Sequence, residues 1–272
     1  MRQSLPQLKS FFGFTAAPFT SEVKSDDYFS YPQFDKALDR LRYVADRRGI
    51  ATLTAPSGAG KSTLIRAFMD NLGKTQFFPA YVPEATCSTV ELYKAIAFAF
   101  DIQAPFFKIL IIRQIKERLL NLFQNRKVTP VLILDEAHLL HRPFFDELRI
   151  LLNFDADCSN LLALIIAGQP TLDSSLRLNI NEALAQRIIA RIRLPGFDRP
   201  LAEAYIQHRL KLVGRTAPIF LPDALEAIYT YSNGAARRID RVAETSIYIA
   251  FSRRHKDIDL DTVNLAIAEL DE

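Results

Sequence analysis

The chain has 272 residues, of which 49% are hydrophobic and 24% are charged, and its formal net charge at pH 7 is +3. This composition is typical of a soluble globular protein with one large or two small domains, and its mild basicity permits nucleic-acid contact without requiring it. The two cysteines, Cys87 and Cys158, lie far apart. They argue against a disulfide framework or a zinc site and favour a reducing, cytoplasmic compartment. No apolar run is long enough to cross a bilayer, so we expect no membrane association.

The first two thirds of the chain alternates between strand and helix patterns. Residues 1–30 are rich in Phe and Pro and are expected to pack as irregular structure. Apolar residues at helical spacing then predict a helix that ends at Gly49. After it, the expected strands are 50–55, 77–82, 130–138, 161–168 and 192–197, and the expected helices are 62–72, 88–100, 107–124, 143–154 and 181–192. This alternation predicts an α/β fold, with a parallel sheet covered by helices on both faces.

The strand patterns stop after Pro200, and the rest of the chain predicts a small all-helical domain. Its four expected helices are 201–214, 222–232, 236–251 and 260–270. We therefore expect three parts. Residues 1–48 form an N-terminal extension and first helix that pack on the core, 49–197 form the α/β domain, and 198–272 form the helical domain.

A glycine-rich stretch follows the first expected strand and opens the next helix. It approaches the phosphate-binding pattern G-x-x-x-x-G-K-[ST], with Ala55 in place of the first glycine. In such a loop, backbone amides surround phosphate oxygens, a lysine reaches the terminal phosphates and a hydroxyl binds Mg²⁺. The residues expected to bind nucleotide here are Pro56, Ser57, Gly58, Ala59, Gly60, Lys61, Ser62 and Thr63.

The missing glycine at Ala55 lies at the strand end, far from the terminal phosphates. Its absence costs on the order of 1 kcal/mol if the backbone needs a positive φ there, and little otherwise. That cost is small beside several charge-assisted hydrogen bonds to phosphate. The alternative is that small residues form this turn by chance. The loop alone does not exclude that alternative, so a second motif is needed.

The second motif is the apolar stretch Val131–His138, which ends in two adjacent carboxylates. In phosphoryl transfer one carboxylate holds hydrated Mg²⁺, and its neighbour orients or polarises the attacking water. Asp135 fits the first role, together with Ser62, and Glu136 fits the second. The alternative is that the two carboxylates are simply solvated at the end of a strand. The glycine-rich loop argues against it, because it precedes the strand by a distance that suits an α/β crossover. The cofactors expected are ATP and Mg²⁺. The letters DEAH also name a helicase family, which we reject because the sequence lacks a second parallel sheet.

The order of motifs resembles the AAA+ ATPases. The stretches that carry the resemblance are the loop, the acidic strand, "LIIAGQP", "LAQRIIARIRL" and "SNGAARRID". The N-terminal "FFGFTAAPF" and the approach to the loop are similar to the subgroup that includes the secretion ATPase ExeA and the transposition regulators TniB, TnsC and MuB. The resemblance covers nearly the whole chain. It implies an AAA+ P-loop fold with a helical lid, ATP hydrolysis, and ATP bound between subunits of a ring or helical filament.

The same resemblance assigns further catalytic and nucleotide-binding roles. Gln169 is similar to the sensor-1 position, although it could simply cap the turn before Pro170. Arg187 or Arg191 resembles the finger that reaches a neighbouring subunit's nucleotide, although both could belong to a solvated helix face. Arg237 resembles the sensor-2 arginine of the lid. The family often has proline before that arginine, whereas this chain has Ala236, so the assignment between Arg237 and Arg238 stays open.

Three classes of output follow from the resemblance. The first is a regulator of transposition that oligomerises on double-stranded DNA and recruits a transposase. A basic stretch before the acidic strand favours it, and an ordinary solvated helix face is its alternative. The second is a secretion-apparatus ATPase, whose relatives carry a membrane span and a wall-binding domain after the ATPase. We expect the first class, because this sequence ends with the lid. The third is a switch ATPase with protein partners alone, and initiator or helicase-loader relatives are a further alternative. The residues expected to contact DNA are Lys94, Lys108, Arg113 and Lys116.

Overall fold

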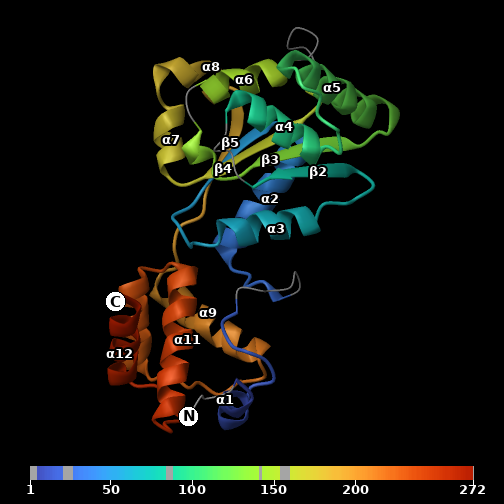
Figure 1. The fold of residues 1–272 in the computed structure, drawn as a ribbon. Coiled ribbons are helices and arrows are strands. Elements are labelled where there is room, and N and C mark those ends of the chain that lie inside the picture. The colour runs from blue at the N-terminus through green and yellow to red at the C-terminus, as the bar shows by residue number, and fades with distance from the viewer. Residues whose placement is uncertain (1–4, 21–26, 84–87, 141–142, 154–159, 272) are drawn as a thin grey trace. The chain divides into compact units, whose positions relative to one another are not determined.

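The protein is described from a computed structural model, in residues 5–20, 27–83, 88–140, 143–153 and 160–271. Cys87 and Cys158, on which the expectation of no disulfide or zinc site depends, lie outside these residues. The chain divides into two compact units, which Figure 1 draws. The α/β unit comprises Pro32–Ala55 and Lys61–Leu194, and the helical unit comprises Met1–Tyr31, Pro56–Gly60 and Pro195–Glu272.

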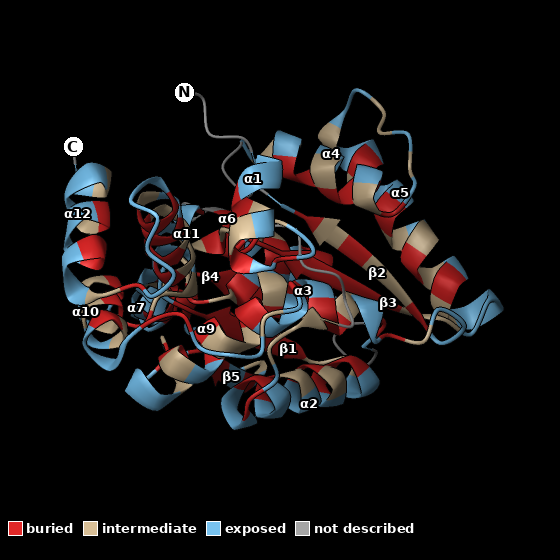
Figure 2. Cartoon of the chain, turned by 90° about the horizontal axis from the view of Figure 1, so that it is seen from below, coloured by how far each residue is buried: buried red, intermediate tan, exposed pale blue. Residues whose placement is uncertain are grey.

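The α/β unit contains a five-stranded sheet of order β2-β3-β4-β1-β5 in which all the paired strands are parallel. All residues of β1 and β4 are buried, and Figure 2 shows the sheet mostly in the colour of buried residues. Such apolar strands are expected where helices cover both faces of a parallel sheet. The strands are β1 (Ile50–Thr54), β2 (Phe77–Val82), β3 (Thr129–Leu134), β4 (Ala163–Gly168) and β5 (Ile188–Arg193).

Helices connect these strands, so the predicted α/β fold is confirmed. The helix before the third strand is typical: Ile111, Ile115 and Leu119 recur every four residues and are fully buried. The helices are α2 (Pro32–Arg47), α3 (Lys61–Asp70), α4 (Thr89–Ala99), α5 (Lys108–Leu120), α6 (Pro143–Leu151), α7 (Thr171–Leu176) and α8 (Glu182–Ala185). Three single turns are η2 (Asn121–Asn125), η3 (Ala137–Leu139) and η5 (Asn179–Asn181).

The helical unit contains the four helices predicted after Pro200. Asp198 caps the first of them, because its carboxylate accepts a hydrogen bond from the Leu201 amide at 3.0 Å. Asn233 ends the second in the left-handed conformation, with φ of 49°. The helices are α9 (Arg199–Leu212), α10 (Pro222–Ser232), α11 (Ala236–Ser252) and α12 (Leu260–Asp271).

The N-terminal segment differs from its prediction in structure. Residues Leu5–Phe12 form helix α1, which contacts α11 within the helical unit, whereas we expected irregular structure. The Phe11 ring lies 5.4 Å from that of Phe251, and the Thr15 amide donates to the Val213 carbonyl at 2.9 Å. The physical reason is that its phenylalanines need an apolar partner, which the lid helices supply.

The helix predicted over 181–192 is also wrong. Helix α8 ends at Ala185, and Ile188–Arg193 form β5, which pairs with β1 at one edge of the sheet. Buried and less buried residues alternate along β5, which is the period of a strand. The predicted domain boundaries after residues 48 and 197 stay predictions. Along the described ranges, no helix combines the length and the apolar character that a membrane span would need.

Candidate nucleotide-binding site

The sheet brings the two sequence motifs to one edge. Strands β1, β3 and β4 are parallel, and their registers pair Thr54 with Gly168 and Leu134 with Ile166. The segments that follow these strands therefore leave from the same end of the sheet, where parallel α/β proteins bind ligands. The glycine-rich loop follows β1, the two carboxylates follow β3, and Gln169 follows β4.

The loop has the backbone conformation that its glycines predict. Gly58 and Gly60 have φ of 77° and 96°, in the region that favours glycine, and α3 begins directly afterwards at Lys61. Ala55 is different, because it is buried and its amide donates to the Gly168 carbonyl at 3.1 Å, as a continuation of the sheet. It is not among the described residues with a positive φ, so this position does not require glycine.

The Lys61 ammonium group joins the two motifs inside the α/β unit. It donates to Oδ1 of Asp135 and, at 2.8 Å, to Oε1 of Glu136. Lys61 is 8% exposed and Asp135 is 2% exposed, so the contact is largely removed from water. Burial of a charged group costs free energy unless an opposite charge pairs with it, and the two carboxylates supply that pairing for Lys61. The two motifs therefore meet in space.

Tyr81 on β2 is a neighbour of this site that the sequence analysis did not identify. Its hydroxyl donates to Oδ2 of Asp135 at 3.0 Å. Burial is the main cause that raises the pKa of Tyr81, and the nearby Asp135 carboxylate adds to it. The hydroxyl therefore keeps its proton at neutral pH and acts as a donor.

Glu136 has an unusual backbone conformation and a histidine neighbour. Its φ of 53° and ψ of 27° lie in the left-handed region, which non-glycine residues rarely adopt. Its amide donates to Oδ1 of Asp135 at 2.8 Å, and its Oε2 lies 3.5 Å from Nδ1 of His138. A Cβ atom at Gly168 would lie 2.9 Å from the His138 amide nitrogen, so that glycine is what allows the histidine to pack there.

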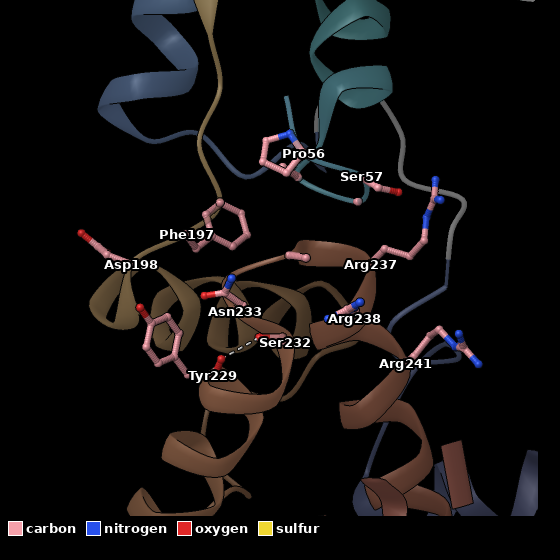
Figure 3. A pocket seen from close by; sticks show the side chains of 14 residues that line it. Pro56, Ser57, Phe197, Asp198, Tyr229, Ser232, Asn233, Arg237, Arg238 and Arg241 are labelled. Carbon is pink, nitrogen blue, oxygen red and sulfur yellow. Dashed lines mark hydrogen bonds between the residues drawn. The ribbon is translucent and has the colours of Figure 1, made fainter. Parts of the chain in front are cut away.

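The helical unit contains a cavity of about 750 Å³ that includes the first part of the loop. Figure 3 shows the side chains of Arg237, Arg238 and Arg241, which come from α11, among the groups that line it. The Arg237 amide donates to the Gly58 carbonyl at 3.1 Å. A Cβ atom at Gly58 would lie 3.0 Å from that of Arg237, so a side chain would crowd the loop here. The predicted sensor-2 arginine therefore lies against the loop.

The other predicted catalytic residues are more scattered. Gln169 directly follows β4, and its backbone carbonyl accepts from the Leu172 amide at 3.0 Å, so the sensor-1 and turn-capping roles of its side chain stay predictions. Arg187 lies in the connection between α8 and β5, whereas Arg191 lies on β5 and is exposed. The two arginines do not share a helix face, because the helix predicted there is a strand.

The four residues expected to contact DNA lie on α4 and α5, and three of them have partners within the chain. Lys108 forms an ion pair with Glu147, and Arg113 donates to Glu117 at 2.9 Å. The Lys116 ammonium donates to the Asn153 carbonyl at 3.0 Å, while Lys94 is exposed on α4. Two of these four positive charges, those of Lys108 and Arg113, are therefore paired with carboxylates.

The residues present fit a magnesium nucleotide. The Ser62 hydroxyl is exposed at the start of α3, and Asp135 supplies carboxylate oxygens, so the donors are the hard oxygen ligands that Mg²⁺ prefers. The loop before α3 has glycine at the positions of positive φ, and the amides at the start of a helix attract anions. The oxygen ligands suit the metal ion of a magnesium nucleotide, and the loop with the amides at the start of α3 suits its phosphates.

The sheet order, the loop after β1 and the paired carboxylates after β3 give this chain the AAA+ P-loop fold, with a helical region after the sheet. A family model described as an AAA domain matches residues 44–176. The chain is 31% identical over 266 residues to general secretion pathway protein A of Aeromonas hydrophila. The match covers 96% of this chain and 48% of the relative, so the chain spans about half the length of that relative.

Solved structures show the same fold at lower identity. Cdc6p of Pyrobaculum aerophilum has a TM-score of 0.69 and 19% identity, over 96% of this chain and 70% of its own. The Aeropyrum pernix ORC1 protein, solved in complex with DNA, has a TM-score of 0.66 and 18% identity, over 90% and 67% of the two chains. The Thermotoga maritima RuvB branch migration motor has a TM-score of 0.59 and 18% identity, over 96% and 73%.

Proposed function

We propose that this protein binds ATP with Mg²⁺ and hydrolyses it to ADP and phosphate. The observation that carries the proposal is the buried Lys61 ammonium group between the carboxylates of Asp135 and Glu136. In this proposal Lys61 is the phosphate-binding cation, Asp135 a metal ligand and Glu136 the water-orienting acid, and the contacts of Lys61 with both carboxylates support these roles. In this proposal the nucleotide phosphates bind to the loop residues Pro56, Ser57, Gly58, Ala59, Gly60, Lys61, Ser62 and Thr63.

Each side chain has a distinct task in this proposal. Ser62 and Asp135 would hold Mg²⁺, and the bound ion would supply neutralisation of the phosphate charge. Glu136 orients the attacking water and accepts its proton. Arg237 is the proposed sensor 2, and Gln169 is the proposed sensor 1. The proposed finger that acts on a neighbouring subunit's nucleotide is Arg187 or Arg191.

Phosphate release by purified variants tests this mechanism. Lys61→Ala should abolish hydrolysis because nucleotide no longer binds, whereas Glu136→Gln should retain ATP binding and lose about 100-fold or more in rate. Lys74→Ala, which removes an exposed lysine outside both motifs, is the matched control and should hydrolyse ATP normally. Wild-type rates in both Lys61→Ala and Glu136→Gln would contradict the proposal.

For the output of this ATPase, we propose action on protein partners as in an ExeA-like secretion ATPase. The 31% identity to general secretion pathway protein A over 96% of this chain supports this output. A cytoplasmic location belongs to the same proposal, because hydrolysis requires a supply of ATP. The test measures the affinity of a candidate partner protein for the assembled ATPase with and without ATP. An affinity that depends on ATP would support this output, and no binding in either state would contradict it for that partner.

The second candidate is the DNA-bound regulator of transposition, with double-stranded DNA and a transposase as partners and a homo-oligomeric ring or filament as its form. The basic residues of α4 and α5 favour it. DNA affinity measured against salt concentration tests it, because each lost phosphate contact flattens the slope by about one. Arg113→Ala together with Lys116→Ala should flatten the slope, whereas Lys74→Ala should not. If DNA binding in the presence of ATP is weak and does not depend on salt, the DNA-bound regulator is contradicted and action on protein partners is favoured.

A further inference from the structure

Tyr81 contacts the site from a strand that neither motif includes. It lies on β2, which pairs with β3 in a register that sets Tyr81 opposite Ile133 and Val82 opposite Leu134. The Asp135 amide continues this pairing, since it donates to the Val82 carbonyl at 2.9 Å. The pairing of β2 with β3 thus fixes the position of Tyr81 along the strands relative to Asp135. The Tyr81 hydroxyl lies 3.0 Å from Oδ2 of Asp135.

Hydrogen bonds reach the Asp135 carboxylate from both sides. Oδ1 accepts from the Lys61 ammonium and from the Glu136 amide, the latter at 2.8 Å. Oδ2 accepts from Tyr81, and among the described residues no other group donates to it. Tyr81 is therefore the one described side chain that restrains this second oxygen.

We infer that Tyr81 is a positioning residue that orients Asp135 for the magnesium ion, an inference that rests on the function proposed above. A carboxylate held at both oxygens loses less rotational freedom when it takes up a role at a metal site. Groups that hold metal ligands in this way typically change metal affinity or activity 10- to 100-fold when they are removed. Because Tyr81 acts through Asp135, its loss should affect the magnesium dependence and spare the contacts between the loop and the phosphates.

The test compares ADP affinity with and without Mg²⁺ by calorimetry, for wild type and Tyr81→Phe. The substitution removes the hydroxyl alone and keeps the ring. Without Mg²⁺, the two proteins should bind ADP equally. With Mg²⁺, the gain in affinity should be about 10-fold or more smaller in Tyr81→Phe, and the Mg²⁺ concentration for half-maximal phosphate release should rise by a similar factor.

Tyr93→Phe is the matched control for this experiment. Tyr93 is another tyrosine of the α/β unit, and its hydroxyl donates to a carboxylate oxygen of Glu147, which has no role in the proposed site, at 2.9 Å. It should keep the wild-type magnesium gain, although it loses a comparable hydrogen bond. A wild-type gain in Tyr81→Phe, or an equal loss in both variants, would overturn the inference. Absence of ADP binding by wild type would instead overturn the proposed function itself.

Discussion

Gly58 is a position of the loop at which a side chain would be strained. It has φ of 77°, and a Cβ atom there would lie 3.0 Å from the Cβ of Arg237. Gly58→Ala should therefore strain the backbone by roughly 1–2 kcal/mol and reduce ADP affinity about 5- to 30-fold. Nucleotide titration checks this prediction.

The control for that substitution is Gly73→Ala. A Cβ atom at Gly73 would meet Oε1 of Gln76 at 3.6 Å, an ordinary contact, and should leave nucleotide affinity unchanged. Equal affinities of Gly58→Ala and wild type would show that the loop does not need this backbone conformation.

At the residue scale, the sequence predicted the groups that lie in motifs and missed those that meet them from elsewhere. Lys61, Asp135 and Glu136 were identified because the spacing of each motif carries its chemistry. Tyr81 is 54 positions from Asp135, and the tertiary structure alone brings them together. Gly168 was missed for the same reason, because its role is to leave space for His138, which packs against it in the folded chain.

At the scale of elements, the long apolar strands and helices were predictable and the short ones were not. The four helices after Pro200 follow their predicted ranges closely, because each has a clear apolar period and a cap or turn. The stretch Arg187–Ile192 was misread as helix because arginines four apart suit a helix face, whereas its isoleucines suit an edge strand. Helix α1 was missed because its partner, α11, lies far along the sequence.

A buried polar cluster links α9 and α11 in the helical unit. The Tyr205 hydroxyl donates to Asp240 at 3.0 Å, and Arg209 donates to the same carboxylate at 3.2 Å. Burial is the largest influence on this group and raises the pKa of Asp240 to about 6, with Glu244 adding to the rise and Arg209 opposing it. The ordinary value is 3.8, so the folded state binds this proton more tightly than the unfolded state does.

This shift predicts a pH dependence of folding. The contribution of the Asp240 proton to stability is fully present below pH 4 and is lost as the pH rises through 6, by about 3 kcal/mol. Urea unfolding of wild type and Asp240→Asn measures it, because the variant lacks this titration. The free energy of unfolding of wild type, relative to the variant, should fall between pH 4 and pH 7. A difference that stays constant over that range would contradict the prediction.

At the scale of the whole molecule, the proposed finger predicts that hydrolysis depends on assembly. If Arg187 acts on a neighbour's nucleotide, Arg187→Ala should bind ATP normally and hydrolyse it about 1,000-fold more slowly at any protein concentration. Arg191→Ala is the matched variant on β5. Loss of activity in Arg191→Ala alone would assign the finger to that residue, and full activity in both variants would exclude a finger from this segment.

The central claim is that the loop and the two carboxylates bind a magnesium nucleotide, and calorimetric titration with ATP and Mg²⁺ tests it most directly. Wild type should give a saturable heat with one site per chain, and Lys61→Ala should give none at the same concentrations. Glu136→Gln should bind like wild type and lack the slow heat of hydrolysis. No heat from wild type, or the same binding heat from Lys61→Ala, would contradict the account.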